Sequence, residues 1–163
     1  APRPTVVPVY SRAVNAFSAT RAGSWLVRHL AARVDPVLFR WSHGRVTVTG
    51  RPTLPMLTLT TTGRRSGQQR SVQLAHLALA DGSWLVVASA MGQDVDPAWL
   101  HNLRADPRAH VLLPGREVDV LASVLGPREA AQRWPSLVRT IPQLRTYARR
   151  TTRDIPVVRL TPR

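Results

Sequence analysis

Leu57-Thr-Leu-Thr-Thr-Thr-Gly63-Arg64-Arg65-Ser66-Gly67-Gln-Gln-Arg70 is the stretch of the sequence that says most about its fold. Leucine and threonine alternate up to Gly63, as in a half-buried β-strand, and a loop with two glycines follows. Glycine accepts a positive φ and lets backbone N–H groups approach a ligand, while neighbouring guanidinium groups suit phosphate or carboxylate. The stretch therefore predicts a strand that ends either in an anion-binding loop or in an exposed, arginine-rich hairpin loop.

The segments after this loop have the pattern of an antiparallel sheet. A strand is expected over about 70–79, and Asp81-Gly82 supplies the turn into a third strand over 83–90. The apolar run Trp84-Leu-Val-Val87 is continuous enough to be a central strand. Helices are expected over 96–106, from 127 onward and over 143–150, with strands over 109–113, 116–125 and 155–160. Connections of hairpin length dominate, which favours an antiparallel sheet or barrel with helices around it over a βαβ arrangement.

Residues 1–45 are expected to form a helical segment that precedes a barrel domain at 46–163. One helix is expected over 9–20, and a second begins after Ser24 with an apolar stripe and interspersed arginines. Two interpretations of residues 24–41 remain open. They pack on the barrel, or they form a basic amphipathic segment that rests on an anionic membrane surface at the inner face of the cell membrane.

Composition limits the class of protein. A chain of 163 residues with 44% hydrophobic content suits one domain with a core. No apolar run approaches the roughly 20 residues that span a bilayer, and the start Ala1-Pro-Arg-Pro lacks the pattern of a signal peptide, so we expect a cytoplasmic protein. The absence of cysteine excludes disulfides and thiolate metal sites, and the five histidines show no metal-type pairing, so no metal is expected.

The net charge of +14 is carried by arginine alone. Residues 1–80 hold eleven arginines and one acid, giving +10, whereas residues 81–163 hold twelve arginines and eight acids, giving +4. The more basic half contains the glycine loop, and its field would attract nucleic acid, an anionic membrane or a multiply charged small ligand. Nucleic acid is disfavoured, because two Phe and two Tyr offer little surface for base stacking.

Several familiar catalytic motifs are missing, namely the Walker A loop, G-x-G-x-x-G and G-x-S-x-G. Three segments remain as candidates for a site: the glycine loop, the small-residue turn Ala88-Ser-Ala-Met-Gly92, and a helix start with Asp96 as N-cap and Pro97 at its first position. Small residues admit a flat ring, Trp99 offers an aromatic wall, and Asn102 both donates and accepts hydrogen bonds. Alternatively, Trp99 is core and Asn102 is a surface residue.

Four segments, in this order, resemble the deazaflavin (coenzyme F420)-dependent nitroreductase family of actinobacteria. They are Thr60-Thr-Thr-Gly-Arg-Arg-Ser-Gly-Gln-Gln-Arg-Ser-Val72, Val86-Val-Ala-Ser89, Pro97-Ala-Trp-Leu-His-Asn-Leu-Arg-Ala-Asp-Pro107, and Tyr147 with Arg150-Thr-Thr-Arg-Asp-Ile-Pro-Val-Val158. The resemblance covers about 46–160. It implies a split β-barrel of the FMN-binding type, with about six mostly antiparallel strands, flanking helices and often a homodimeric assembly.

The resemblance also implies a cofactor and its contacts. The family binds coenzyme F420, with FMN the less favoured cofactor here, and transfers a hydride between C5 of the reduced deazaflavin and a substrate. Carried across by motif, the residues for the phosphate and polyglutamate tail are Gly63, Arg64, Arg65, Ser66, Gly67 and Arg70. Those lining the deazaflavin ring are Val87, Ala88, Ser89, Ala90, Met91 and Gly92, with Pro97, Ala98, Trp99, Leu100 and Asn102 on its other side.

The sequence departs from the family pattern around the ring and the substrate. Relatives commonly read Ser-Lys-Gly-Gly where this chain has Ser89-Ala-Met-Gly92, and Ile141 and Leu144 replace tyrosines, leaving only Tyr147. The expected function is therefore an F420H2-dependent reductase of a planar, apolar small molecule such as a quinone, enone or nitroaromatic. Tyr147 is the candidate for orienting or protonating this acceptor. The alternative is a non-catalytic F420-binding protein.

Overall fold

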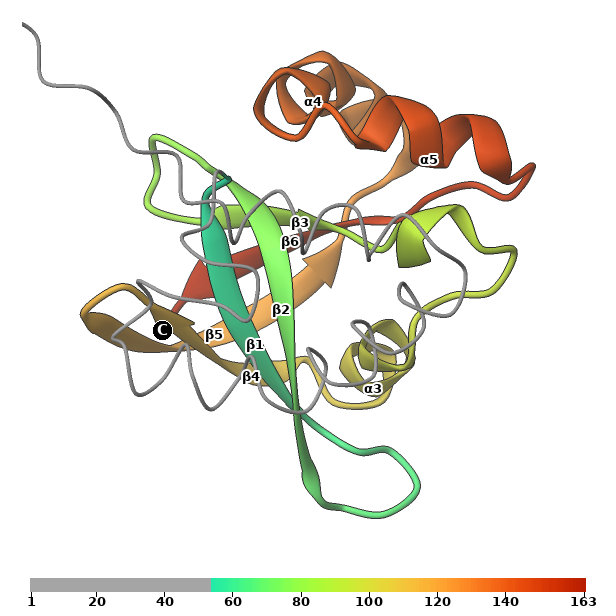
Figure 1. Ribbon diagram of the computed structural model, residues 1–163. Helices are drawn as coiled ribbons and strands as arrows, with labels where there is room; N and C mark the ends of the chain where they lie inside the picture. Colours follow the sequence, from blue (N-terminus) through green and yellow to red (C-terminus); the bar gives the residue numbers. More distant parts are fainter. Residues whose placement is uncertain (1–53) are drawn as a thin grey trace, which may run out of the picture. The chain divides into compact units, whose positions relative to one another are not determined.

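The computed structural model describes residues 54–163, in which six strands close into an antiparallel barrel (Figure 1). Each strand pairs with two neighbours in the order β1-β2-β3-β6-β5-β4, and β4 pairs back onto β1. The strands are β1 Met56–Thr62, β2 Gln69–Ala78, β3 Trp84–Val87, β4 Arg108–Leu113, β5 Arg116–Val124 and β6 Val157–Pro162. The predicted split barrel of about six antiparallel strands is confirmed.

Three α-helices and a short 3-10 turn accompany the strands in residues 54–163. They are η1 Ala90–Gly92, α3 Ala98–Ala105, α4 Pro127–Thr140 and α5 Leu144–Arg150. Each predicted helix of this region is present, but α3 begins at Ala98 with Pro97, not Asp96, as its N-cap residue. The carboxylate of Asp96 is bound by two arginines, Arg104 and Arg153, and gives no side-chain cap to the helix.

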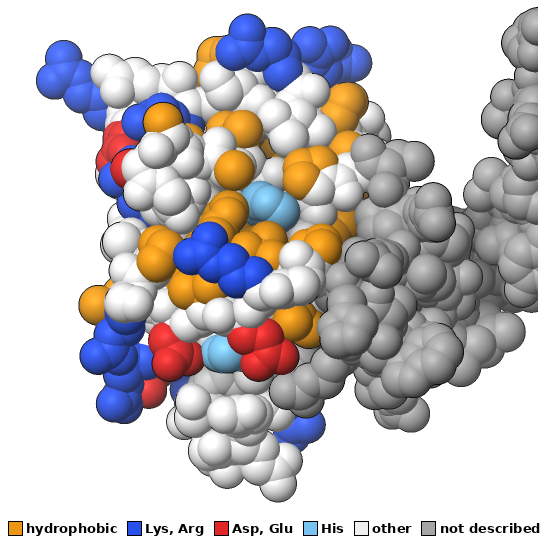
Figure 2. All heavy atoms as spheres, turned by 90° about the vertical axis from the view of Figure 1, so that its left-hand side faces the viewer, with side chains coloured by type: hydrophobic (Ala, Val, Ile, Leu, Met, Phe, Trp, Pro, Cys, Tyr) orange, Lys and Arg blue, Asp and Glu red, His pale blue; other side chains and the backbone are white. Residues whose placement is uncertain are grey.

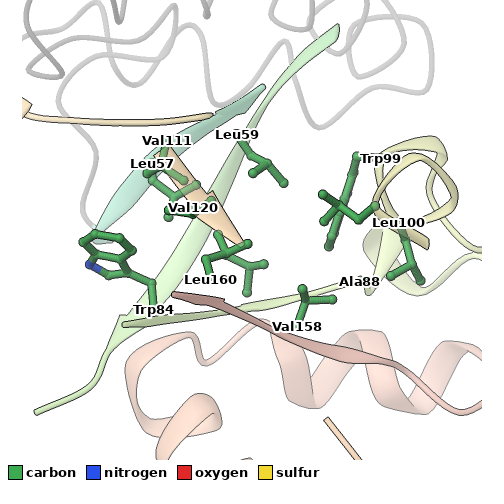
Figure 3. Close-up of a cluster of buried hydrophobic side chains, with 12 residues drawn as sticks. Leu57, Leu59, Trp84, Ala88, Trp99, Leu100, Val111, Val120, Val158 and Leu160 are labelled. Atoms are coloured by element: carbon green, nitrogen blue, oxygen red, sulfur yellow. The ribbon is translucent and has the colours of Figure 1, made fainter. Parts of the chain in front are cut away.

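The barrel interior is filled from alternate positions of the strands. In β1, Leu57 and Leu59 are fully buried, and Leu59 lies opposite Val72 of β2 on one side and Val111 of β4 on the other. Figure 3 shows side chains from several strands and from α3 meeting in this core. The alternation of leucine and threonine in β1 therefore reflects one face turned to the core.

The strand β3 is buried on both faces, which explains its continuous apolar run. It pairs with β2 on one side and β6 on the other, so the prediction of a central strand is confirmed. Trp84 and Val86 belong to the barrel core, whereas Leu85 and Val87 pack in a second cluster with residues of α4 and α5. The two helices cover this side of the barrel (Figure 1). A strand between two apolar layers needs no polar positions.

The face that carries the β4–β5 hairpin has its acidic side chains paired. His110 lies between Glu117 and Asp119, with ring nitrogens 3.4 Å and 3.0 Å from their carboxylate oxygens. Figure 2 shows a histidine flanked by two acidic side chains on this side of the molecule, below an arginine that lies across apolar side chains. The Arg116 guanidinium lies 5.8 Å from the centroid of the Trp84 ring, in the range of a cation–π contact.

Residues 53–163 form one unit of the chain and residues 1–52 another. The expected helices over 9–20 and 24–41, and the expected segment 1–45, lie outside the described residues. Within 54–163, none of the helices is long and apolar enough to cross a membrane.

The buried histidine His76 should make the stability of the protein depend on pH. Burial lowers the pKa of His76 in β2 to about 4, and its Nδ1 has no hydrogen-bond partner among the described residues. Between pH 7 and pH 5 the unfolded chain takes up a proton at this histidine, whose ordinary pKa is about 6.5, and the folded chain does not. Stability should therefore fall by about 2 kcal/mol from this group over that interval.

Urea unfolding of the wild type and of His76→Gln at pH 7 and pH 5 measures the effect. Glutamine cannot take up the proton, so the loss of stability on acidification should be about 2 kcal/mol smaller in the variant. All other titrating groups are common to both proteins and cancel in the comparison. An equal loss in the two proteins would contradict the prediction.

Candidate functional site

The loop between β1 and β2 together with the first two residues of β2, residues 63–70, is called the arginine loop below. It is closed by backbone hydrogen bonds from Gly63 N to Gln68 O and from Gly67 N to Gly63 O, both 2.7 Å. Gly67 has a φ of +66°, and a Cβ on Gly63 would lie 2.8 Å from Ser66 Oγ and 3.0 Å from Gln68 O. Gly67 is thus required by its backbone conformation, and Gly63 by the lack of space for a side chain.

Asn102 of α3 holds the arginine loop against the barrel. Its Oδ1 accepts a hydrogen bond from the backbone N–H of Arg64 at 3.1 Å, and its Nδ2 donates to Thr61 Oγ1 of β1 at 3.0 Å. The side chain is only 7% exposed. Asn102 is therefore a buried connector of loop, strand and helix, not the surface residue of the alternative interpretation.

A cavity of about 640 Å³, the arginine cavity, lies between this loop and α3. Arg64, Arg65 and Arg70 are exposed and line it, and no carboxylate of the described residues forms an ion pair with any of them. The acid in its wall, Asp96, is already paired with two other arginines. Within the described residues, this arrangement leaves guanidinium groups without a carboxylate partner around a hollow, although Arg70 donates a hydrogen bond to Gln68 Oε1 at 3.1 Å. Such groups suit a ligand with several negative charges. The hairpin loop is thus both exposed and part of a pocket.

A second cavity of about 410 Å³, the apolar cavity, adjoins the first. Val72 and Trp99 line both cavities, so the two meet at these side chains. Ile141, Leu144 and Tyr147 from the α4–α5 region form part of its wall. Trp99 is at once a core residue and a wall of the site, because its side chain is 7% exposed and packs in the barrel cluster.

The turn η1 that borders the apolar cavity has an unusual backbone. Ala90, Met91 and Gly92 have φ values of 45°, 57° and 81°, and the first two are the only non-glycine residues with positive φ in the described part of the chain. A Cβ on Gly92 would lie 2.8 Å from Arg150 Cβ and 2.9 Å from the Tyr147 carbonyl oxygen of α5. Glycine at 92 therefore lets the turn approach the helix that carries Tyr147.

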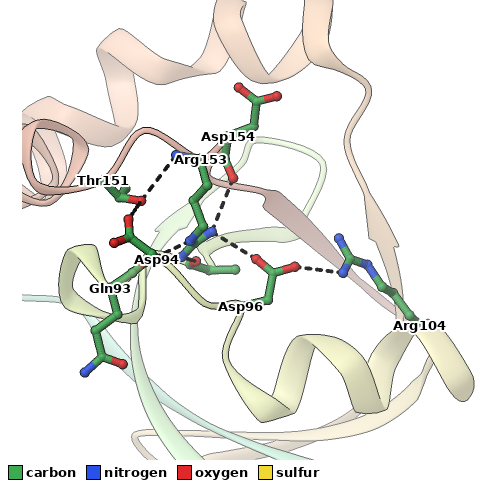
Figure 4. Close-up of polar contacts among 8 residues, drawn as sticks. Gln93, Asp94, Asp96, Arg104, Thr151, Arg153 and Asp154 are labelled. Carbon is green, nitrogen blue, oxygen red and sulfur yellow. Dashed lines mark hydrogen bonds and ion pairs between the residues drawn. The ribbon is translucent and has the colours of Figure 1, made fainter.

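Arg153 fastens the segment from β3 to α3, residues 88–97 (Figure 4). Its guanidinium donates to the carbonyl oxygens of Ala88 at 2.8 Å and Gln93 at 2.9 Å, and to Asp96 Oδ1 at 2.9 Å. Asp96 also accepts from Arg104 Nη1 at 2.8 Å, and Thr151 Oγ1 donates to Asp94 at 2.7 Å. One side chain thereby fixes the wall of the apolar cavity and the start of α3.

Most of the residues predicted for the site lie around the two cavities. Those lining the arginine cavity are Gly63, Arg64, Arg65, Ser66, Arg70, Ala98, Trp99 and Asn102. Those lining the apolar cavity are Val87, Ser89, Ala90, Met91, Pro97, Trp99, Ile141, Leu144 and Tyr147. Four predicted residues line neither cavity: Ala88 and Leu100 are fully buried in the barrel core, Gly92 packs on α5, and Gly67 closes the arginine loop.

Sequence reasoning missed other residues of the cavity walls. In the arginine cavity they are Ser71, Val72 and His101, and in the apolar cavity Leu54, Met56, Val72, Gln73, Leu74, Ala75 and Gln143. Asp96 also lines the arginine cavity, but it was predicted only as a helix cap. Five of the missed residues, 71–75, lie on β2. The expected strand at 70–79 indicated which residues alternate along β2, but only the barrel shows that this strand borders both cavities.

Comparisons with known proteins agree with this geometry. The family model of the F420H(2)-dependent quinone reductases matches residues 31–162. An F420H(2)-dependent quinone reductase of Mycobacterium tuberculosis is 33% identical over 147 residues, which are 85% of this chain and 97% of that protein. A putative F420H(2)-dependent quinone reductase of the same organism is also 33% identical, over 69% of this chain and 94% of its own length.

Two solved structures are similar to this chain. An F420-H2 dependent reductase, FDR-A, has a TM-score of 0.60 and 32% identity, covering 65% of this chain and 93% of its own. A protein described as a domain-swapped dimer has a TM-score of 0.62 and 28% identity, and the match covers 84% of this chain and 98% of that protein. The barrel fold and the similarity to FDR-A place the chain in the class of split-barrel reductases.

The chain belongs to the F420H(2)-dependent quinone reductase family. It is an F420H2-dependent oxidoreductase, and coenzyme F420 is its cofactor. The predicted relationship to F420-dependent reductases is confirmed. Of the two functions expected from the sequence, family membership supports the reductase and not the non-catalytic F420-binding protein.

The contacts of Arg153 should determine how rigidly the segment 88–97 is held. Arg153→Met removes the hydrogen bonds to the carbonyl oxygens of Ala88, Gln93 and Asp154 and the ion pair with Asp96. The Arg153 side chain is only 15% exposed, so we expect a loss of about 2–4 kcal/mol in stability. The backbone amides of residues 88–93 should also exchange hydrogen faster, because their segment loses its anchor. Denaturant unfolding and hydrogen exchange measure the two effects.

Arg104→Met is the matched control. Arg104 binds the same Asp96, but its side chain is 46% exposed, so its removal should cost less than about 1 kcal/mol and leave exchange at 88–93 unchanged. Equal effects of the two substitutions would contradict the prediction that Arg153, unlike Arg104, holds this segment in place.

Proposed function

We propose that the two cavities hold the two ends of F420 and that the acceptor is a planar, apolar quinone. The observation that supports this most strongly is the junction at Val72 and Trp99 between a cavity walled by unpaired arginines and one walled by apolar side chains. F420 joins a flat deazaflavin ring to a tail with a phosphate and several carboxylates. The two ends of this cofactor match the two kinds of wall.

In this proposal the tail is bound by the arginine loop. Arg64, Arg65 and Arg70 donate charge-assisted hydrogen bonds, each contributing about 1.5–3 kcal/mol where water is excluded. Ser66 adds a hydroxyl group, while Gly63 and Gly67 give the loop its shape. The unpaired state of the three guanidinium groups supports the assignment, because binding the tail breaks no ion pair of the described residues.

The ring and the acceptor are assigned to the apolar cavity. Bound F420H2 supplies the hydride, and the protein orients the reactants and excludes water. The proposed ring contacts are Val87, Ala88, Ser89, Ala90, Met91 and Gly92 on one side and Pro97, Ala98, Trp99, Leu100 and Asn102 on the other. Of these, Ala98 and Asn102 line the arginine cavity and would meet the cofactor where the ring joins the tail. Ala88, Gly92 and Leu100 act through packing behind the wall, since they line neither cavity.

The proposed acceptor contacts are Ile141, Leu144 and Tyr147. Ile141 and Leu144 are nearly fully buried and offer an apolar floor, which suits a quinone ring better than a charged substrate. Tyr147 is the candidate to orient the acceptor or to donate a proton to the reduced oxygen.

The arginine loop is tested by Arg65→Ala. We expect F420 to bind roughly tenfold to a hundredfold more weakly, because one charge-assisted contact with the tail is lost. The measurement is a titration that follows the fluorescence of F420. Arg128→Ala is the control: it removes the same charge from an exposed position on α4 that lines neither cavity, and it should leave the affinity within about twofold. If the two variants bind equally well, the assignment of the tail fails.

We further propose that the protein is a homodimer in the cytoplasm. The support for the dimer is the similar structure described as a domain-swapped dimer, which covers 84% of this chain. Light scattering coupled to size-exclusion chromatography should give twice the chain mass of 18.0 kDa. A mass of one chain at micromolar concentration would contradict this. The expectation that residues 24–41 contact an anionic membrane stays a prediction.

A further inference from the structure

We infer that Met91 is a specificity-determining residue for the acceptor: its side chain forms the outer wall of the apolar cavity and contacts the apolar part of the acceptor that extends from the ring. This inference rests on the proposed function. It assigns to Met91 a contact with the acceptor, beyond the general lining of the ring site.

The backbone at Met91 is unfavourable for any side chain. Its φ of 57° and ψ of 28° lie in the left-handed region, and the preceding Ala90 also has a positive φ of 45°. A Cβ in this region crowds the neighbouring carbonyl oxygen, so glycine would be favoured at both positions. A methionine at 91 therefore lowers the stability of the turn relative to a glycine there.

Burial within the described residues does not offset this strain. Met91 is 46% exposed, one of four large hydrophobic residues of residues 54–163 that are left exposed. It lines the apolar cavity, whereas another exposed residue of the same segment, Val95, lines neither cavity. An exposed apolar side chain on the wall of a binding cavity gains its contacts when a ligand covers it.

The position of Met91 indicates which part of a ligand it meets. Ile141 and Leu144 are 5% and 2% exposed and form the floor of the cavity, while Met91, at 46%, forms its outer wall. A quinone ring seated on the floor would turn any apolar substituent outward past Met91. Methionine suits this role because its unbranched, polarisable side chain adapts to chains of different shape.

The test compares two acceptors and two substitutions. The acceptors are 2-methyl-1,4-naphthoquinone and the same ring carrying two isoprene units, each reduced with F420H2. In Met91→Gly we expect KM for the isoprenoid quinone to rise roughly three- to tenfold, with less than a twofold change for the bare ring, because only the substituent loses a contact. Met91→Leu keeps the apolar bulk and should stay within about twofold of the wild type for both acceptors.

Two further measurements separate this role from a structural one or from cofactor binding. The melting temperature of Met91→Gly should be no lower than that of the wild type, because the relief of strain compensates for the greater freedom of the unfolded chain. Its affinity for F420, from the fluorescence titration, should fall by a smaller factor than KM for the isoprenoid quinone rises, because the other proposed ring contacts, Trp99 among them, remain in place. Val95→Ala removes an exposed apolar side chain outside the cavities and should change none of these quantities.

The outcomes distinguish the inference from the function on which it rests. If KM changes equally for both acceptors, if it changes for neither, or if the affinity for F420 falls tenfold, Met91 does not select the acceptor, although the reductase assignment stands. If the wild type reduces neither quinone with F420H2, the proposed acceptor class fails and the inference fails with it. Met91→Ala serves the same comparison if the glycine variant does not fold.

Discussion

The carboxamide of Asn102 is the interaction on which the arrangement of the site depends. With its oxygen it accepts a hydrogen bond from the arginine loop, and with its nitrogen it donates one to β1, while its backbone belongs to α3. A buried amide whose partners are in place holds them in one geometry, because each unpaired group would be costly to bury. The loop of arginines and the helix that carries Trp99 are therefore held on opposite sides of one cavity.

Arg153 complements Asn102 at the other cavity. Its contacts with Ala88, Gln93 and Asp96 hold the segment after β3 in a conformation that Ala90 and Met91 would not adopt by themselves. Local strain persists where surrounding contacts determine the backbone, and such strain is typical of ligand-binding segments. The barrel thus supplies a rigid frame, and two polar side chains position the walls of the two cavities.

The strands and helices from Met56 onward could be predicted because their signals are local. Leucine and threonine alternate in β1, Asp81-Gly82 marks a hairpin turn, and Trp84–Val87 has the apolar run of a strand buried on both faces. The role of Arg153 could not be predicted, since its partners lie 57 to 65 residues away in the chain. For Asp96 the local signal was misleading: its position before Pro97 suggested a helix cap, but its carboxylate is bound by two arginines.

The sequence by itself determined the alternating strands, the glycine loop with its positive charge, and a resemblance strong enough to identify the family and the cofactor. These features depend on the type of each residue and on the spacing and order of the motifs, all of which can be read along the chain. Only the tertiary structure decided that the charged and apolar cavities meet at Val72 and Trp99, and that Ala90 and Met91 adopt a left-handed backbone. Both depend on contacts between residues distant in the chain, such as Asn102 with Thr61, which exist only once the barrel has closed.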